Sequence, residues 1–251
     1  MRGARAKPAP LYDSTTRGGV ARAILRAVRS LVRIVAWLAA AIALPAIGGS
    51  LLGNFGLLVG IALVALSILW LWLWLPRSAH GAFATGAFGK AARRYRVLGT
   101  LTRSAERERA ALLSRIGCAI AAGEVDEAQR LIANVEVSAL DAQERAVLLN
   151  NRACIALARG GDAHAALALV DEASALRPDV PALQHTRGMA LLAVGRVDDA
   201  IAVLDGMRAA GELAPRLEAE RCSGLAQAWT RKGETAYAED YRLRADALTA
   251  R

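Results

Sequence analysis

The side chains that could bind a metal ion, or act as nucleophile and base, are few and scattered in this chain. They are three histidines and three cysteines: His80, His164, His185, Cys118, Cys154 and Cys222. None of them stands at the spacing of a metal-ligand motif, and the sequence has no phosphate-binding glycine loop and no nucleophile elbow. We therefore expect no catalytic residue, no metal and no cofactor, and we expect the cysteines to be reduced, buried thiols of a cytosolic domain.

The composition predicts an all-α protein, because Ala, Leu, Arg and Glu dominate the 251 residues and only 5% are aromatic. The net charge of +9 is unevenly distributed. Residues 1–33 carry eight basic side chains and one acid, residues 77–109 carry eight and two, and residues 110–251 carry sixteen and twenty. The basic excess thus flanks a hydrophobic block, which favours membrane topology over nucleic-acid binding.

The hydrophobic block, residues 34–75, contains no charged side chain. As one straight helix it would be about 63 Å long, roughly twice the hydrocarbon thickness of a bilayer. Gly, Ser and Asn cluster in residues 48–54, so we expect a break there, between one span at about 31–48 and another at about 54–75. Arginines at both ends predict a transmembrane helical hairpin with both ends in the cytoplasm; a cleaved signal peptide is the weaker alternative.

Aromatic and basic side chains mark the expected membrane–water interface. Trp70, Trp72 and Trp74 alternate as they would in a strand, but in a helix they lie within about 6 Å of one depth, like an aromatic belt. We expect the interface to contain Arg33, Trp37, Trp70, Trp72, Trp74, Arg77, Arg93 and Arg94. The arginines among them, together with Arg96, would lie near anionic head groups.

Small residues recur along the expected hairpin. Gly49, Gly53, Gly56 and Gly60 follow a 4-3-4 spacing that lets helices approach closely in lipid. This stripe predicts packing within the hairpin or, alternatively, homo-oligomerisation through the same face. Ahead of it, residues 20–33 are expected to form a basic amphipathic segment on the membrane surface, and residues 1–19 to be disordered.

Residues 109–251 contain a repeat. A glycine followed five residues later by an alanine occurs at Gly123, Gly161, Gly195 and Gly233, at spacings of 38, 34 and 38. The segments LNNRACIALARGGDAHAALALVDEASALRP and ALQHTRGMALLAVGRVDDAIAVLDGM extend the match, and the pattern resembles the tetratricopeptide repeat (TPR) family. The resemblance implies an α-solenoid of about four to five helix pairs, in which no single pair buries its apolar face alone.

Residues 76–108 leave two interpretations open. Gly86, Phe88, Ala91 and Tyr95 follow the spacing of the repeat, and Gly86 precedes Gly123 by 37 residues. The segment is therefore either a degenerate further repeat, which we favour, or a set of juxtamembrane basic helices that matches the pattern by chance.

The TPR resemblance also implies a partner-binding groove, because in that family the first helix of each pair lines the concave side. Carried over to this sequence, the groove residues are Asn151, Arg152, Ile155, Arg159, His185, Met189, Leu192, Ser223, Gln227 and Arg231. This mixture suits a peptide with one or two apolar anchors. It lacks the dense Lys and Asn set with which some TPR domains bind a C-terminal carboxylate.

These features predict a non-enzymatic scaffold, anchored in the bacterial inner membrane, that binds an unidentified protein or peptide on the cytoplasmic side. Two alternatives stay open. The first is a structural subunit of an envelope complex for secretion or motility. The second follows from layout, since two N-terminal spans followed by TPR helices are similar to HemY-type proteins, which implies a role in porphyrin or haem synthesis.

Overall fold

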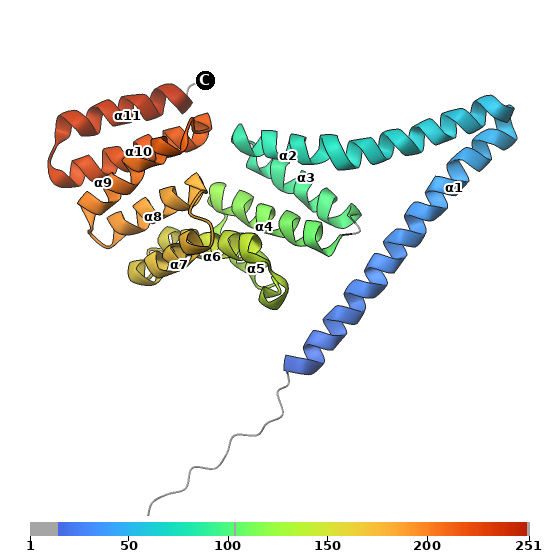
Figure 1. Cartoon of the computed structure of the whole chain (residues 1–251), viewed down its shortest axis with the longest axis horizontal. Helices are drawn as coiled ribbons and strands as arrows, with labels where there is room; N and C mark the ends of the chain where they lie inside the picture. Colours follow the sequence, from blue (N-terminus) through green and yellow to red (C-terminus); the bar gives the residue numbers. More distant parts are fainter. Residues whose placement is uncertain (1–14, 103, 250–251) are drawn as a thin grey trace, which may run out of the picture. The chain divides into compact units, whose positions relative to one another are not determined.

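A computed structural model describes residues 15–102 and 104–249 of the chain, and every regular element in these ranges is helical (Figure 1). This confirms the all-α class over the described residues. The chain divides into two compact units, residues 1–69 and residues 70–251. The first unit contains the long helix α1, Thr15–Leu69. Residues 15–19 of the segment expected to be disordered are therefore helical, while residues 1–14 lie outside the described part.

Helix α1 is sharply bent at Gly53, whose backbone angles (φ 60°, ψ −146°) are not helical. Gly48 and Gly56 would be about 12 Å apart in a straight helix. Here a Cβ added to Gly48 would collide with the carbonyl oxygen of Gly56, and a Cβ on Gly60 would lie 2.6 Å from the Cα of Pro45. The chain therefore turns back at Gly53, and the two arms of α1 cross closely next to the bend.

The structure changes the expected roles of the glycine stripe. Gly56 and Gly60 lie at the crossing of the two arms, where Gly56 faces Gly48 and Gly60 faces Pro45. Gly49 is not part of the crossing, since a Cβ there would make only an ordinary 3.7 Å contact with Leu57. Gly53 forms the bend and has nothing within 4 Å of a Cβ. The predicted break at 48–54 is thus narrower than expected, because the backbone stays helical on both sides of one glycine with a positive φ.

A five-residue π-helix, Trp70–Trp74, follows α1 directly and is followed without a loop residue by α2, Leu75–Ala84. Pro76, near the start of α2, explains the wider turn. It has no N–H to donate to the carbonyl of Trp72, and its ring crowds that carbonyl. The sequence did not predict this π-turn.

Within the described residues, five helix pairs form the second unit (Figure 1). They are α2 with α3 (Phe88–Leu101), α4 (Ala105–Ala121) with α5 (Val125–Ile132), α6 (Ala142–Ala158) with α7 (Ala163–Leu176), α8 (Pro181–Ala193) with α9 (Val197–Gly206), and α10 (Pro215–Lys232) with α11 (Thr235–Thr249). Short 3-10 turns occur at Val137–Ala139 and Met207–Ala210.

The turn inside every pair has the same backbone geometry. Each is built on a glycine with φ between 62° and 83°: Gly86, Gly123, Gly160, Gly195 and Gly233. In all five, the N–H of the next residue donates to the carbonyl five residues earlier, at 2.8–3.0 Å, which is a Schellman cap. Five identical caps define a helical repeat with spacings of 35–38 residues.

The third pair departs slightly from the predicted pattern. Its cap glycine is Gly160 and not Gly161, because this turn contains one extra residue before the next helix. Asp162 uses that extra residue to cap α7, and its Oδ1 accepts hydrogen bonds from the backbone N–H groups of His164 and Ala165.

Alanine dominates the contacts between helices of the second unit. The alanines with no exposed surface are Ala79, Ala91, Ala128, Ala153, Ala166, Ala173, Ala190, Ala200 and Ala228. Small side chains let helix axes approach closely, and larger partners fill the remaining space. Leu204, for example, is fully buried against Gly188, where a Cβ would lie 2.6 Å from its Cγ.

Candidate functional site

The first helices of the pairs carry nine of the ten groove residues predicted from the TPR resemblance, and the tenth, Arg159, is the C-cap of α6; three of the ten are buried between repeats. Ile155 and Leu192 belong to apolar clusters, with 4% and 2% of their surface exposed. Asn151 is 5% exposed, and its Nδ2 donates to the carbonyl oxygen of Leu113 at 3.3 Å. These side chains hold neighbouring pairs together, so a ligand cannot reach them in this state.

Three other predicted groove residues lie together on the last pair. Ser223, Gln227 and Arg231 line an open pocket of about 410 Å³ between α10 and α11. The rest of the lining is Ala226, Thr230, Arg242, Ala245 and Asp246. Arg231 also donates a hydrogen bond to the carbonyl oxygen of Leu192, which links α10 to α8. This pocket is open and most of its lining residues are polar, unlike the buried positions on α6 and α8.

The remaining predicted groove residues are divided between two places. Arg159, the C-cap of α6, is exposed and pairs with Asp126 at 2.6 Å, while Arg152 on α6 is half-buried. His185 and Met189 are half-buried on α8, and Met189 Sδ would lie 3.2 Å from a Cβ on Gly224 of α10. Burial lowers the pKa of His185, against the opposing charge of Glu220.

A contact that the sequence did not predict joins the last pair to the first. The guanidinium carbon of Arg216, at the start of α10, lies 4.6 Å from the ring centre of Phe83 and 4.5 Å from that of Phe88. Arg216 also pairs with Glu220 at 2.7 Å. Only the Arg-x-x-x-Glu spacing was visible in the sequence, and it indicates a pair on one helix, not a contact across more than 120 residues.

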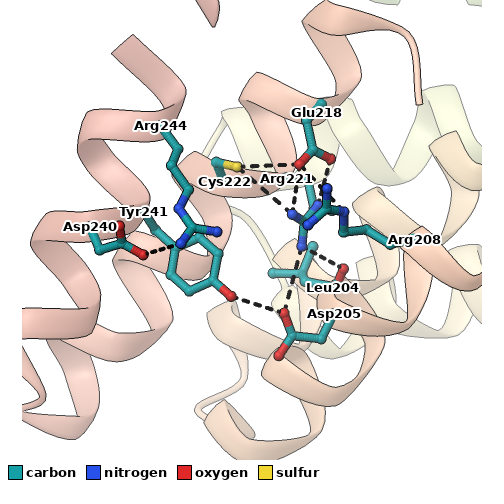
Figure 2. A network of polar contacts seen from close by, with 9 residues as sticks. All are labelled: Leu204, Asp205, Arg208, Glu218, Arg221, Cys222, Asp240, Tyr241 and Arg244. Atoms are coloured by element: carbon teal, nitrogen blue, oxygen red, sulfur yellow. Dashed lines mark hydrogen bonds and ion pairs between the residues drawn. The ribbon is translucent and has the colours of Figure 1, made fainter. Parts of the chain in front are cut away.

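A buried polar network holds the last pair to α9 (Figure 2). Arg221 is 1% exposed, and its Nε and Nη2 donate to the two carboxylate oxygens of Glu218 at 2.8 Å and 2.7 Å. Its Nη1 donates to the carbonyl of Leu204 at 3.4 Å and lies 3.6 Å from Asp205. The bidentate Arg221 guanidinium lowers the pKa of Glu218. Because this arginine is satisfied on all sides, the network is structural and not an open anion site.

Cysteines and histidines do not gather into a chemical site. Within the described ranges, no group of three or more His, Cys, Asp or Glu side chains is placed to hold a metal ion. The three cysteines are free; Cys118 and Cys222 are buried and Cys154 is half-buried. Burial raises the pKa of Cys118 to about 11. His80 shares a 2.7 Å hydrogen bond with the Tyr95 hydroxyl and so serves the packing of α2 on α3.

The tryptophans of the expected interface contact side chains of the first two repeats. Trp70, Trp72 and Trp74 are all exposed, and the rings of Trp70 and Trp74 stack at 5.7 Å, so these two share a face. Arg94 lies over Trp74 at 5.5 Å and donates to the carbonyl of Ser78, and Arg107 lies over Trp72 at 3.5 Å.

The other interface residues make local contacts. Arg77 of α2 donates to the carbonyl of Leu73 in the π-turn, and Arg93 donates to the carbonyl of Gly89 within α3. Trp37 is half-buried, and the side chain of Arg33 lies outside the described part. By length and composition, one helical stretch of the described residues, Val35–Ala84, could cross a membrane, with a mean hydropathy of 2.5 over an 18-residue window.

A scan against protein-family models and a search of curated proteins found no match. Among solved structures, MamA MSR-1 C2 is similar, with a TM-score of 0.40 and 17% identity over 70% of this chain and 95% of that one. The TPR-like repeats of a putative Podosopora anserina kinesin light chain, and a single-residue variant of them, give TM-scores of 0.44 and 0.45, each with 19% identity over 70% and 93%. The five caps of this chain, and not these similarities, define its helical-repeat fold.

Proposed function

We propose that this protein is a helical-repeat scaffold, held in the bacterial inner membrane by residues 34–75, that binds a partner protein or peptide on the cytoplasmic side. The observation that carries this proposal is that the charge-free stretch, residues 34–75, runs into the repeat solenoid with no loop residue between α1, the π-turn and α2. A membrane anchor raises the effective concentration of a bound partner, so a weakly binding surface suffices.

Exposed apolar side chains support the anchor. Leu51, Phe55 and Ile42 expose 74%, 70% and 69% of their surface, which is unfavourable in water and favourable in lipid. The bend at Gly53 divides the charge-free block into residues 34–52 and 54–75, each close to the roughly 20 residues that one span needs. We therefore propose two spans, an N-terminus and solenoid in the cytoplasm, and arginines that contact anionic head groups. Homo-oligomerisation through the glycine face stays a prediction.

The anchor is tested by membrane fractionation and by labelling. A cysteine introduced at Asn54, next to the bend, should react with an impermeant maleimide from outside the cytoplasmic membrane. A fluorescent protein that folds only in the cytoplasm should be bright when fused to the C-terminus. Extraction of the chain by alkaline carbonate would contradict the anchor, and an unreactive Asn54→Cys with a carbonate-resistant chain would contradict the two-span topology.

The scaffold is tested by co-purification from detergent-solubilised membranes. Intact protein is compared with Gln227→Ala/Arg231→Ala in the α10–α11 pocket and with a matched control on α5, Gln129→Ala/Arg130→Ala, which also removes one exposed amide and one exposed guanidinium. A partner retained by the control and lost by the pocket variant is the expected result. Partners that survive both changes would contradict binding at this pocket.

The two alternative functions predict different results in the same cells. A stoichiometric assembly that survives detergent and is insensitive to the pocket variant would favour a structural subunit of an envelope complex. Porphyrin accumulation in a deletion strain, without loss of a bound protein, would favour a HemY-like role.

A further inference from the structure

The Arg216 contact spans the whole solenoid. Phe83 ends α2 and Phe88 begins α3, so both rings flank the cap glycine of the first pair, while Arg216 lies in the first turn of the last pair. The two rings meet edge to face at 5.6 Å, and the guanidinium lies within 5 Å of both ring centres. Figure 1 shows α2 and α10 next to each other. The first and last repeats are therefore joined across the side lined by the first helices.

Two further groups on that side feel the Arg216 charge. Cys118 lies on α4, and the positive charge of Arg216 opposes the rise in its thiol pKa that burial causes. His185 lies on α8, where Glu220 and Arg216 act with opposite sign on its imidazole. One guanidinium thus lies near groups of the first, second, fourth and fifth pairs.

The hydrogen-bond donors of Arg216 are only partly paired. One Arg216 nitrogen, Nη2, pairs with Glu220 at 2.7 Å, but Nη1 is buried and has no hydrogen-bond acceptor among the described residues. The side chain keeps 26% of its surface exposed. Two ring faces attract a guanidinium, while an unpaired buried donor opposes closure, so the net preference for the closed arrangement is small.

We propose that the notch between Phe83 and Phe88 is a guanidinium-binding site, that Arg216 is its ligand within the chain, and that its occupancy is a reversible clasp between the first and last pairs. When Arg216 leaves the notch, the first and last pairs separate. This inference does not depend on the membrane anchor or on the identity of a partner.

The test uses the full chain in lipid nanodiscs with a donor and an acceptor fluorophore at exposed Lys90 and Glu212, introduced as non-canonical amino acids because three native cysteines are present. Arg216→Ala should lower the closed-to-open ratio about tenfold, the factor that about 1.4 kcal/mol of cation–π contact represents. Millimolar ethylguanidinium should restore energy transfer in this variant, and ethylammonium should not, because only the planar cation stacks on the rings.

Arg244→Ala is the matched control. Arg244 also lies over a ring, that of Tyr241 at 5.3 Å, and also forms an i,i+4 ion pair, with Asp240 at 2.7 Å, but within the last pair. It should leave energy transfer unchanged. An equal change in both variants, or no change in a fully helical Arg216→Ala, would overturn the clasp. A change that ethylguanidinium does not reverse, or that ethylammonium reverses equally, would overturn the guanidinium site.

A second variant keeps the test decisive if Arg216→Ala does not fold. Phe88→Leu retains an apolar side chain but removes one ring face, and it should also lower energy transfer. Tyr241→Leu is its control, since it removes the ring under Arg244. A folded Phe88→Leu with the energy transfer of the parent chain would contradict the proposal.

Discussion

Helix α1 and the repeat solenoid are both helical, but their apolar side chains differ in exposure. Large apolar side chains are exposed along both arms of α1, from Val32 to Leu69. Beyond the π-turn, the large exposed apolar residues among those the structure describes are Val97, Val137, Val147, Tyr237 and Leu243. In the solenoid, alanines and leucines are buried against the neighbouring helix. The exposed apolar side chains of α1 are in contact with the surrounding medium, while each repeat of the solenoid buries apolar surface of the next.

The largest expected effect is a loss of stability confined to the solenoid. Arg221→Ala should lower the free energy of unfolding of the last pairs by about 3 kcal/mol, because it leaves Glu218 partly buried without its bidentate partner. Faster hydrogen exchange in α10 and α11 of the full chain would report this loss. Arg208→Ala, which removes an exposed cation 3.9 Å from the same carboxylate, should cost under about 1 kcal/mol. Equal effects would contradict the importance of burial.

A pair of glycine substitutions tests whether the two regions are independent. Gly188→Ala places a Cβ 2.6 Å from the buried Leu204 side chain and should cost about 1–3 kcal/mol, seen as faster exchange in α8 and α9. Gly60→Ala creates an equally close contact with Pro45, but within α1. It should leave exchange in α8 and α9 unchanged. Faster exchange there would mean that the two units are coupled.

The third prediction concerns which glycine caps α6. Gly160→Ala should cost about 1 kcal/mol, since alanine is strained at φ 62°. Gly161→Ala should cost less, because Gly161 has an ordinary φ. A Cβ there would lie 3.3 Å from the carbonyl oxygen of Ala156, a contact that a small shift relieves. Thermal unfolding of the two variants is the measurement, and the reverse order would show that the cap is misplaced by one residue.

The smallest expected effect is a pH dependence confined to the solenoid. Because burial lowers the pKa of His185 below its ordinary 6.5, the unfolded chain takes up a proton first. Stability is therefore full above about pH 6.5 and falls as the pH drops from there towards the folded pKa. Glu220 and Arg216 face this imidazole, and the carboxylate reduces the effect. His185→Gln should flatten the dependence of unfolding on pH between about 7 and 5.5, and exposed His164→Gln should not.

Local rules made the fold predictable. The cap glycines were located to within one residue, because a Schellman turn needs a residue with positive φ and glycine adopts it without strain. The one error, Gly161 for Gly160, arose where two glycines are adjacent and Asp162 competes as a cap. The bend at Gly53 lies inside the predicted 48–54 segment for the same local reason.

Contacts between distant repeats were not predictable in the same way. Family positions identify the helix face of Asn151, Ile155 and Leu192, but the closeness of the next helix decides whether that face is open, and this depends on alanines elsewhere. Arg216 meets Phe83 and Phe88 only because three intervening helix pairs bring the first and last pairs together. The spacing of residues within one repeat does not predict a contact between the first repeat and the last.

The extra residue in the α6–α7 turn has a practical consequence. This turn keeps the same cap as the other four although its chain is one residue longer, so turn length does not set how the pairs stack. Glycine and aspartate there face solvent and carry no apolar packing. The Gly160–Asp162 turn is therefore the natural place to insert a peptide tag or a small reporter domain while both flanking helices stay in register.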